Sequence, residues 1–122
     1  MKNETTITLP LPDAKLSPNA RIHWAQKARL VKAHRASALS AGWAEVGTLD
    51  ITRFKSYRLT FYWPDKRRRD QDGAASRCKA YLDGIADAIG QDDSEWNFDG
   101  VRFEIDKEKP RVEIVFQVED GN

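Results

Sequence analysis

The sequence contains a single cysteine and no long apolar run. Cys78 has no partner for an internal disulfide, and a zinc site built on several cysteines is excluded. A lone thiol of this kind is typical of a buried residue in a reducing compartment. No stretch approaches the roughly 20 apolar residues of a membrane span, and residues 1–8 lack the apolar core of a signal peptide. We therefore expect a cytoplasmic protein without a membrane partner.

Length and charge narrow the class further. The 122 residues, 40% of them hydrophobic and 32% charged, suit a single folded domain over residues 1–122 rather than a disordered chain. Residues 1–82 hold 16 Lys+Arg against 7 Asp+Glu, whereas residues 83–122 hold 4 against 12. This asymmetry predicts two electrostatic faces, of which the basic one suits a polyanion. The alternative is that the acidic half is only a solvated surface.

Hydrophobic periodicity predicts the order strand, helix, strand, helix, strand, strand. The expected strands are 5–9, 57–63, 101–105 and 112–118, and the expected helices are 22–43 and 73–89. The last two strands flank a short turn and are expected to pair as a closing β-hairpin. Together these elements predict a small α/β (α+β) sandwich in which two main helices pack on a mixed sheet.

The most informative segment joins the central strand to the second helix. Four basic residues, Lys66, Arg67, Arg68 and Arg69, precede Asp70 and Asp72. If this segment is extended, side chains two apart point the same way and the two carboxylates converge. Such hard oxygen ligands suit Mg²⁺ or Mn²⁺. Water molecules and a substrate phosphate then complete the coordination shell of the metal. The alternative is structural, with Asp72 capping the second helix.

Further candidates lie around the second helix. Asp92 and Asp93 follow it, and a return loop would bring them to the first acidic pair; alone, they would form a solvated loop. Lys79 either stabilises charge on a reacting phosphate or only pairs with Asp83 at i,i+4 spacing. Three acids with adjacent positive charge match what metal-assisted phosphodiester cleavage requires.

Aromatic and histidine residues have two interpretations. His23 and His34 lack partners at ligand spacing, so each is expected to contact phosphate or to lie on the surface. The tryptophans are expected in the core by default, although Trp24 is also placed to stack on an unpaired base.

Several motifs together resemble RusA-type Holliday junction resolvases, especially phage-borne ones. They are Leu9-Pro10-Leu11-Pro12, Ser17-Pro18-Asn19, His23-Trp24, Trp63-Pro64-Asp65, the Arg-Arg-Arg-Asp-x-Asp run, Lys79-x-x-x-Asp83-Gly84-Ile85 and Asp92-Asp93-Ser94. The resemblance spans nearly the whole chain in order. It implies a homodimeric, Mg²⁺-dependent endonuclease that nicks two opposing strands of a four-way DNA junction in recombination and repair.

The resemblance also assigns roles to residues. It implies that Asp70, Asp72 and Asp93, with Asp92 beside them, hold the metal, and that Lys79 is the functional lysine. The expected DNA contacts are Asn19, His23, Lys66, Arg67, Arg68 and Arg69.

Gly73 stands where the family usually has Asn. This departure leaves open a branched-DNA-binding protein of phage origin with impaired catalysis, and a third possibility is a phage interaction protein in which the acids only cap helices.

Overall fold

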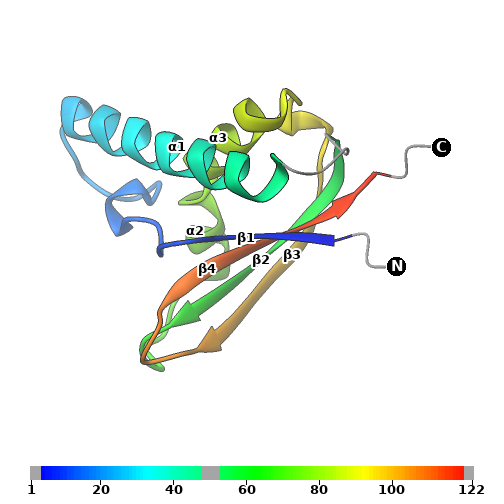
Figure 1. Ribbon diagram of the computed structural model, residues 1–122. Helices are drawn as coiled ribbons and strands as arrows, with labels where there is room; N and C mark the ends of the chain where they lie inside the picture. The colour runs from blue at the N-terminus through cyan, green and yellow to red at the C-terminus, as the bar shows by residue number, and fades with distance from the viewer. Residues whose placement is uncertain (1–3, 48–52, 120–122) are drawn as a thin grey trace.

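The computed structural model describes residues 4–47 and 53–119, and its helices lie over one face of a four-stranded mixed sheet (Figure 1). The strands are β1 (Glu4–Leu9), β2 (Phe54–Trp63), β3 (Asn97–Ile105) and β4 (Arg111–Val118). The helices are α1 (Trp24–Val46), α2 (Gln71–Ser76) and α3 (Lys79–Ile89), with short 3-10 turns η1 (Ala14–Leu16) and η2 (Asp93–Glu95). The predicted α+β class, with a small mixed sheet and two main helices, is confirmed.

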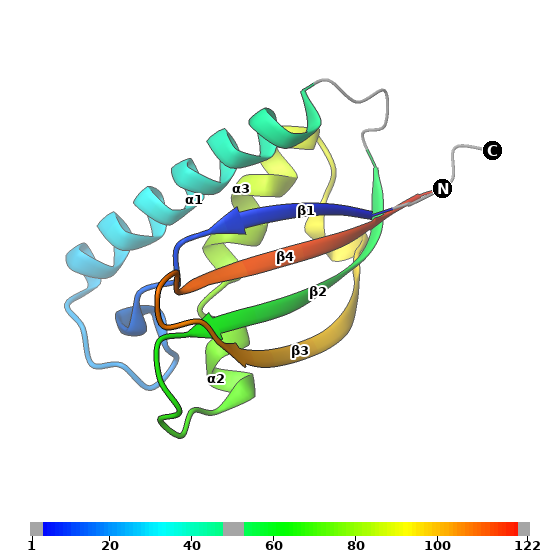
Figure 2. The same cartoon turned by 60° about the horizontal axis from the view of Figure 1, so that its bottom comes forward.

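The sheet order is β1-β4-β2-β3, so the predicted closing hairpin is wrong. β4 pairs antiparallel with β1 and β2, while β3 runs parallel to β2 at the edge (Figure 2). Two strand spacings amount to roughly 10 Å, a gap that the five residues 106–110 easily cross. The more apolar β2 takes the central position and β3, mostly exposed or half-buried, takes the edge.

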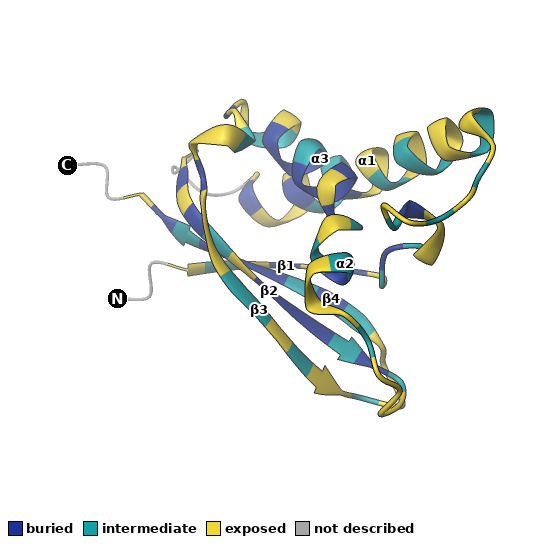
Figure 3. Ribbon diagram, turned by 180° about the vertical axis from the view of Figure 1, so that it is seen from behind, coloured by how far each residue is buried: buried dark blue, intermediate teal, exposed yellow. Residues whose placement is uncertain are grey.

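The core lies between the sheet and the two long helices (Figure 3). Its largest fully buried side chains are Phe54, Phe61, Phe116, Ile7, Leu59, Ile85, Ile114, Val112 and Cys78. Cys78 is 0% exposed, as expected of a lone core thiol, and desolvation raises its pKa to about 12. Its sulfur is therefore protonated at neutral pH. Among the described residues, no helix is long and apolar enough to cross a membrane.

The two long helices approach most closely at Gly84 of α3. A Cβ atom built on this residue would lie 2.2 Å from the carbonyl oxygen of Arg35 and 2.8 Å from Cβ of Ala38, both in α1. The Arg35 side chain, which interrupts the apolar face of α1, forms an ion pair of 2.6 Å with Asp87 of α3. Only glycine at position 84 fits this crossing without moving α1.

The predicted second helix is divided in two. α2 begins at Gln71, two residues earlier than expected, and α3 begins at Lys79 after a break at Arg77 and Cys78. α3 ends at Gly90, whose left-handed backbone (φ 69) closes the helix. The break matters for the site, because α2 carries Asp72 whereas α3 carries Lys79.

The tryptophans divide into two pairs. Trp63 and Trp96 are both 6% exposed, whereas Trp24 is 77% and Trp43 58% exposed. The default core assignment is therefore wrong for the latter two. α1 packs on its neighbours through small residues such as Ala38, and both of its tryptophans face solvent.

Candidate functional site

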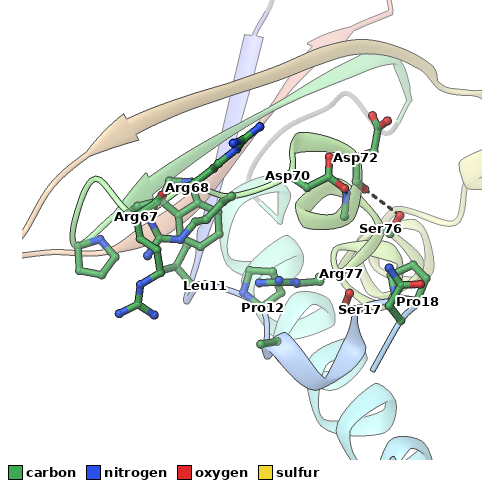
Figure 4. Close-up of a pocket in the computed structure, with 16 residues that line it drawn as sticks. Leu11, Pro12, Ser17, Pro18, Arg67, Arg68, Asp70, Asp72, Ser76 and Arg77 are labelled. Carbon is green, nitrogen blue, oxygen red and sulfur yellow. Dashed lines mark hydrogen bonds between the residues drawn. The ribbon is translucent and has the colours of Figure 1, made fainter. Parts of the chain in front are cut away.

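A hollow of about 700 Å³ separates the opening segment of the chain from the loop after β2 (Figure 4). We call it the arginine hollow. Its charged and amide lining residues are Asn19, Arg67, Arg68, Arg69, Asp70, Asp72 and Arg77. The fold therefore brings together six of the predicted site residues, from segments about 50 positions apart, and adds Arg77. Lys66, His23, Lys79, Asp92 and Asp93 do not line this hollow.

Asp70 and Asp72 are not arranged as predicted, because the chain turns helical between them. Asp70 is extended (φ −88, ψ 124) and caps α2, its Oδ2 accepting a 3.0 Å hydrogen bond from the Gly73 amide. The N-cap is thus Asp70, not Asp72. Asp72 lies in the first turn of α2 and is exposed. Both acids lie at the N-terminal end of α2, and residues two apart in a helix do not face each other. The convergence expected from strand alternation is therefore absent.

The basic run forms a loop that is tied together by Arg69. Its guanidinium lies 4.3 Å from the Trp63 ring centroid and donates to the carbonyl oxygen (3.0 Å) and to Oδ1 (2.9 Å) of Asp65. The Arg67 amide also donates to Asp65 Oδ1, at 2.9 Å. This amide and the Arg69 guanidinium lower the pKa of Asp65. Arg69 thus stabilises the loop, while Lys66, Arg67 and Arg68 remain exposed for a ligand.

Lys79 forms a second part of the site. Its Nζ lies 2.6 Å from Oδ2 of Asp93 and 3.0 Å from Oδ1 of Asp83. Asp93 first, and then Asp83, raise the pKa of Lys79 by accepting these hydrogen bonds. The structural pairing with Asp83 therefore exists, and it is joined by a contact with one of the predicted metal ligands. Lys79 is a cation at neutral pH.

The two acids after α3 have different surroundings. Asp93 is partly buried and contacts Lys79. Asp92 is exposed and caps η2, because its Oδ1 accepts a 2.9 Å hydrogen bond from the Ser94 amide. That amide lowers the pKa of Asp92.

Buried Gln91 anchors the segment after α3 to β2. Its Oε1 accepts a 2.7 Å hydrogen bond from the Phe54 amide, and its Nε2 donates a 2.8 Å hydrogen bond to the Phe54 carbonyl. Sequence analysis missed this anchor, since a glutamine after a glycine is typical of an open loop.

Lys79 lines a second hollow, of about 280 Å³, which we call the lysine hollow. Lys27 of α1 and Asp83 of α3 also line it. Three residues, Pro18, Ser76 and Arg77, line both hollows, so the two are contiguous. Arg77 is the residue that sequence analysis missed at this junction. Its Nε is buried and has no hydrogen-bond partner within the part of the chain that the structure describes. The only sequence signal was a basic residue two positions before Lys79.

The donor chemistry fits Mg²⁺ only in part. No group of three or more His, Cys, Asp or Glu side chains able to hold a metal occurs in residues 4–47 and 53–119. The expected return of Asp92 and Asp93 to the arginine hollow is not seen there. Mg²⁺ commonly takes one or two protein carboxylates and completes its shell with water and phosphate. Asp70 and Asp72 lie at the same end of α2, and each offers one such carboxylate.

The histidines are placed by backbone contacts. His23 is exposed and caps α1, because its Nδ1 accepts a 3.1 Å hydrogen bond from the Ala25 amide. His34 is half-buried. Its Nε2 accepts a 3.1 Å hydrogen bond from the Asp13 amide, and its ring stacks on that of Tyr81 with centroids 5.0 Å apart. The expectation that His34 contacts phosphate or lies on the surface is therefore wrong. It holds the opening segment against α1 and α3.

Comparison with known proteins finds one uncharacterized relative and no matching family model. The relative is a protein of Xylella fastidiosa (strain Temecula1 / ATCC 700964), 39% identical over 97 residues. The alignment covers 76% of this chain and 63% of the relative, so the chain spans less than two thirds of the protein it matches. Because the relative has no described activity, any function must be argued from the site itself.

Proposed function

We propose that this protein is a Mg²⁺-dependent endonuclease that resolves four-way DNA junctions by paired nicks in recombination and repair. The observation that carries the proposal is the arginine hollow, where two carboxylates, Asp70 and Asp72, lie beside four guanidinium groups. Arginine is well suited to phosphate, because its planar fork donates two parallel hydrogen bonds. Carboxylates beside it suit a divalent cation. The resemblance to RusA-type resolvases supports the same assignment.

The residues divide into binding and chemical roles. Arg67, Arg68 and Arg77 bind backbone phosphates together with Asn19, which lines the same hollow, and Lys66 and His23 would contact the DNA from outside it. Asp70 and Asp72 would hold Mg²⁺, and Asp93, which lines neither hollow, would have to approach them from its contact with Lys79. The chemistry that Mg²⁺ would supply there is polarisation of the phosphate and activation of a water molecule.

Lys79 supplies positive charge rather than a base. Its raised pKa keeps the ammonium protonated at neutral pH, so it stabilises negative charge on the phosphate oxygens or on the leaving oxygen. Asp93 and Asp83 hold this ammonium, which lines the lysine hollow next to the arginine hollow. Two opposing strands require two such sites, so the active form would be a symmetric homodimer acting in the cytoplasm.

A second candidate function is binding of branched DNA without cleavage. It is favoured by the pairing of Lys79, whose ammonium already contacts two carboxylates at 2.6 and 3.0 Å. Gly73 in place of the usual Asn points in the same direction. In this alternative the basic surface binds the junction, but the acids serve as a helix cap and an ion pair.

The test uses a labelled four-way junction and a linear duplex of matched sequence, each with Mg²⁺ and with EDTA. Paired nicks in the junction alone, and only with Mg²⁺, are the expected result. Junction binding without nicks in Mg²⁺ or Mn²⁺ would replace the nuclease by the second candidate. Failure to bind either DNA at low salt would contradict both.

A further inference from the structure

An exposed tryptophan begins α1, and the function proposed above leaves it unused. Trp24 is 77% exposed, the most exposed large hydrophobic side chain of the described residues. Its ring stacks on His23 with centroids 5.6 Å apart and an interplanar angle of 30°. The His23 ring accepts a hydrogen bond from the Ala25 amide, which caps α1. His23 thus contacts part of the Trp24 ring, and the rest of the indole is open to a ligand.

The sequence on both sides of Trp24 contains basic residues and no acidic ones. No acidic residue occurs between Asp13 and Glu45. Arg21, Lys27, Arg29 and Lys32 are exposed, and none of them takes part in an ion pair within residues 4–47 and 53–119. If Trp24 anchored a protein partner, these unpaired basic side chains would lie at the rim of the interface and lose hydration without gaining an opposite charge. A polyanion would neutralise them. Charge complementarity therefore favours a nucleic acid.

Trp24 also lies close to the proposed site. Lys27 follows it by three positions, which places the two side chains next to each other on the helix surface. Lys27 lines the lysine hollow together with Lys79. The N-terminal end of α1 extends past the ends of the strands (Figures 1 and 2). A duplex arm engaged at the two hollows would therefore also reach this projecting end of the helix.

We infer that Trp24 is a stacking platform for an unpaired base at the branch point of the DNA. A fully paired duplex buries the faces of its bases against one another, whereas a branch point exposes them. Base stacking on an aromatic side chain is sequence-tolerant because every base has a π-face. Trp24 would thus select branched over linear DNA, while the arginines bind both. The inference rests on the proposed action on branched DNA, but it concerns recognition and not cleavage.

The chain contains a matched control for this residue. Trp43 belongs to the same helix and is 58% exposed, yet it lies near the other end, two residues before Glu45. Trp24→Ala and Trp43→Ala remove the same side chain from the two ends of α1. Trp24→Phe keeps a smaller aromatic ring and serves as the conservative variant.

The experiment measures binding in EDTA, so that no DNA is cut. The full-length protein is titrated into a four-way junction carrying 2-aminopurine at the branch point, a second junction labelled within an arm, and a linear duplex. We expect Trp24→Ala to weaken binding to the junction by roughly 5- to 150-fold, which corresponds to the usual range for one base–aromatic stack. Trp24→Phe should lose less, and Trp43→Ala should bind as the wild type. Binding to the linear duplex should be unchanged in all variants.

The label reports contact directly. Wild-type protein should change the 2-aminopurine emission at the branch point and not in the arm, and Trp24→Ala should abolish that change. Junction binding by Trp24→Ala equal to that of the wild type would overturn the inference. An equal loss on the linear duplex would also overturn it, since stacking on an unpaired base cannot act there. Dissociation of a wild-type dimer by Trp24→Ala in sedimentation would overturn it in favour of a subunit contact.

These outcomes are separable from those of the proposed function. Selective loss of junction binding in Trp24→Ala, combined with no nicking by the wild type in Mg²⁺, would support the platform and refute the nuclease. Mg²⁺-dependent nicking by the wild type, combined with unchanged junction binding by Trp24→Ala, would support the nuclease and refute the platform. No binding of the junction by the wild type would refute both.

Discussion

Lys79 Nζ and Asp93 Oδ2 lie 2.6 Å apart, although the two residues are fourteen positions apart in the chain, one at the start of α3 and the other beyond its end. The contact joins the start of α3, where Lys79 lines the lysine hollow, to the segment after the helix. Asp83 shares the same ammonium at 3.0 Å. Two of the residues that the resemblance makes functional are therefore partners of each other before any ligand binds.

This pairing has a measurable effect on the titration of Lys79. Asp93 is the largest cause of its raised pKa, so Asp93→Asn should lower that pKa toward the ordinary 10.5, and more than Asp83→Asn does. Because the folded pKa exceeds the unfolded one, the stabilisation from this pair is present below the unfolded pKa and is lost as pH rises through the folded value. NMR titration of the Lys79 side chain would measure both shifts. A larger shift in Asp83→Asn would contradict this assignment.

Asp70 and Asp72 can be tested separately from their structural roles. Asp70→Asn keeps a good N-cap, since Asn and Asp cap helices about equally well, but it removes a charged metal ligand. We expect Asp70→Asn and Asp72→Asn each to reduce Mg²⁺-dependent cleavage by at least roughly 100-fold, corresponding to a loss of several kcal/mol of charge stabilisation. Thermal unfolding should change little in either variant.

The matched control is Asp99→Asn in β3, an exposed acid that lines neither the arginine nor the lysine hollow. Its cleavage rate should equal that of the wild type. Full activity in Asp70→Asn or Asp72→Asn would exclude that residue as a ligand.

Arg77 is expected to bind phosphate where the two hollows meet. Its side chain lines both hollows, so its guanidinium can meet a DNA phosphate there. Arg77→Ala should weaken binding to junction and linear DNA alike. In a plot of log K against log[salt], the slope should become less steep by about 0.9, the value for one phosphate contact. Arg35→Ala is the control, because Arg35 is already paired with Asp87; an equal slope change in both variants would refute the assignment.

Gly84→Ala tests the crossing of α1 and α3. In an exposed helix this change stabilises by roughly 0.5–1 kcal/mol. Here the new Cβ would lie 2.2 Å from a backbone oxygen of α1, so we expect a loss of roughly 1–3 kcal/mol, the usual cost of overpacking. Urea unfolding would measure this loss as a lower midpoint with an unchanged slope. A midpoint above that of the wild type would show that α1 moves away at no cost.

The four strands and the long first helix could be predicted because hydrophobic periodicity depends on local sequence. The alternation in residues 112–118 identifies β4, for instance, but a strand pattern does not name its neighbours. Only the tertiary structure inserts β2 between β3 and β4, because pairing follows from which strands bury the most apolar surface. The break after α2 escaped prediction for a similar reason, since the apolar stripe continues across Arg77 and Cys78.

For the site, the residue types alone indicate the chemistry, since they comprise a run of basic residues, two acids after it, and a lysine and two acids around the second helix. Tertiary structure decided which of them meet. It turned the chain helical after Asp70, which set the two acids at a helix end instead of on one strand face. It also paired Lys79 with Asp93, added Arg77 to the hollow and left Trp24 in solvent. Residue type fixes what a side chain can bind, whereas long-range packing fixes the distances between side chains.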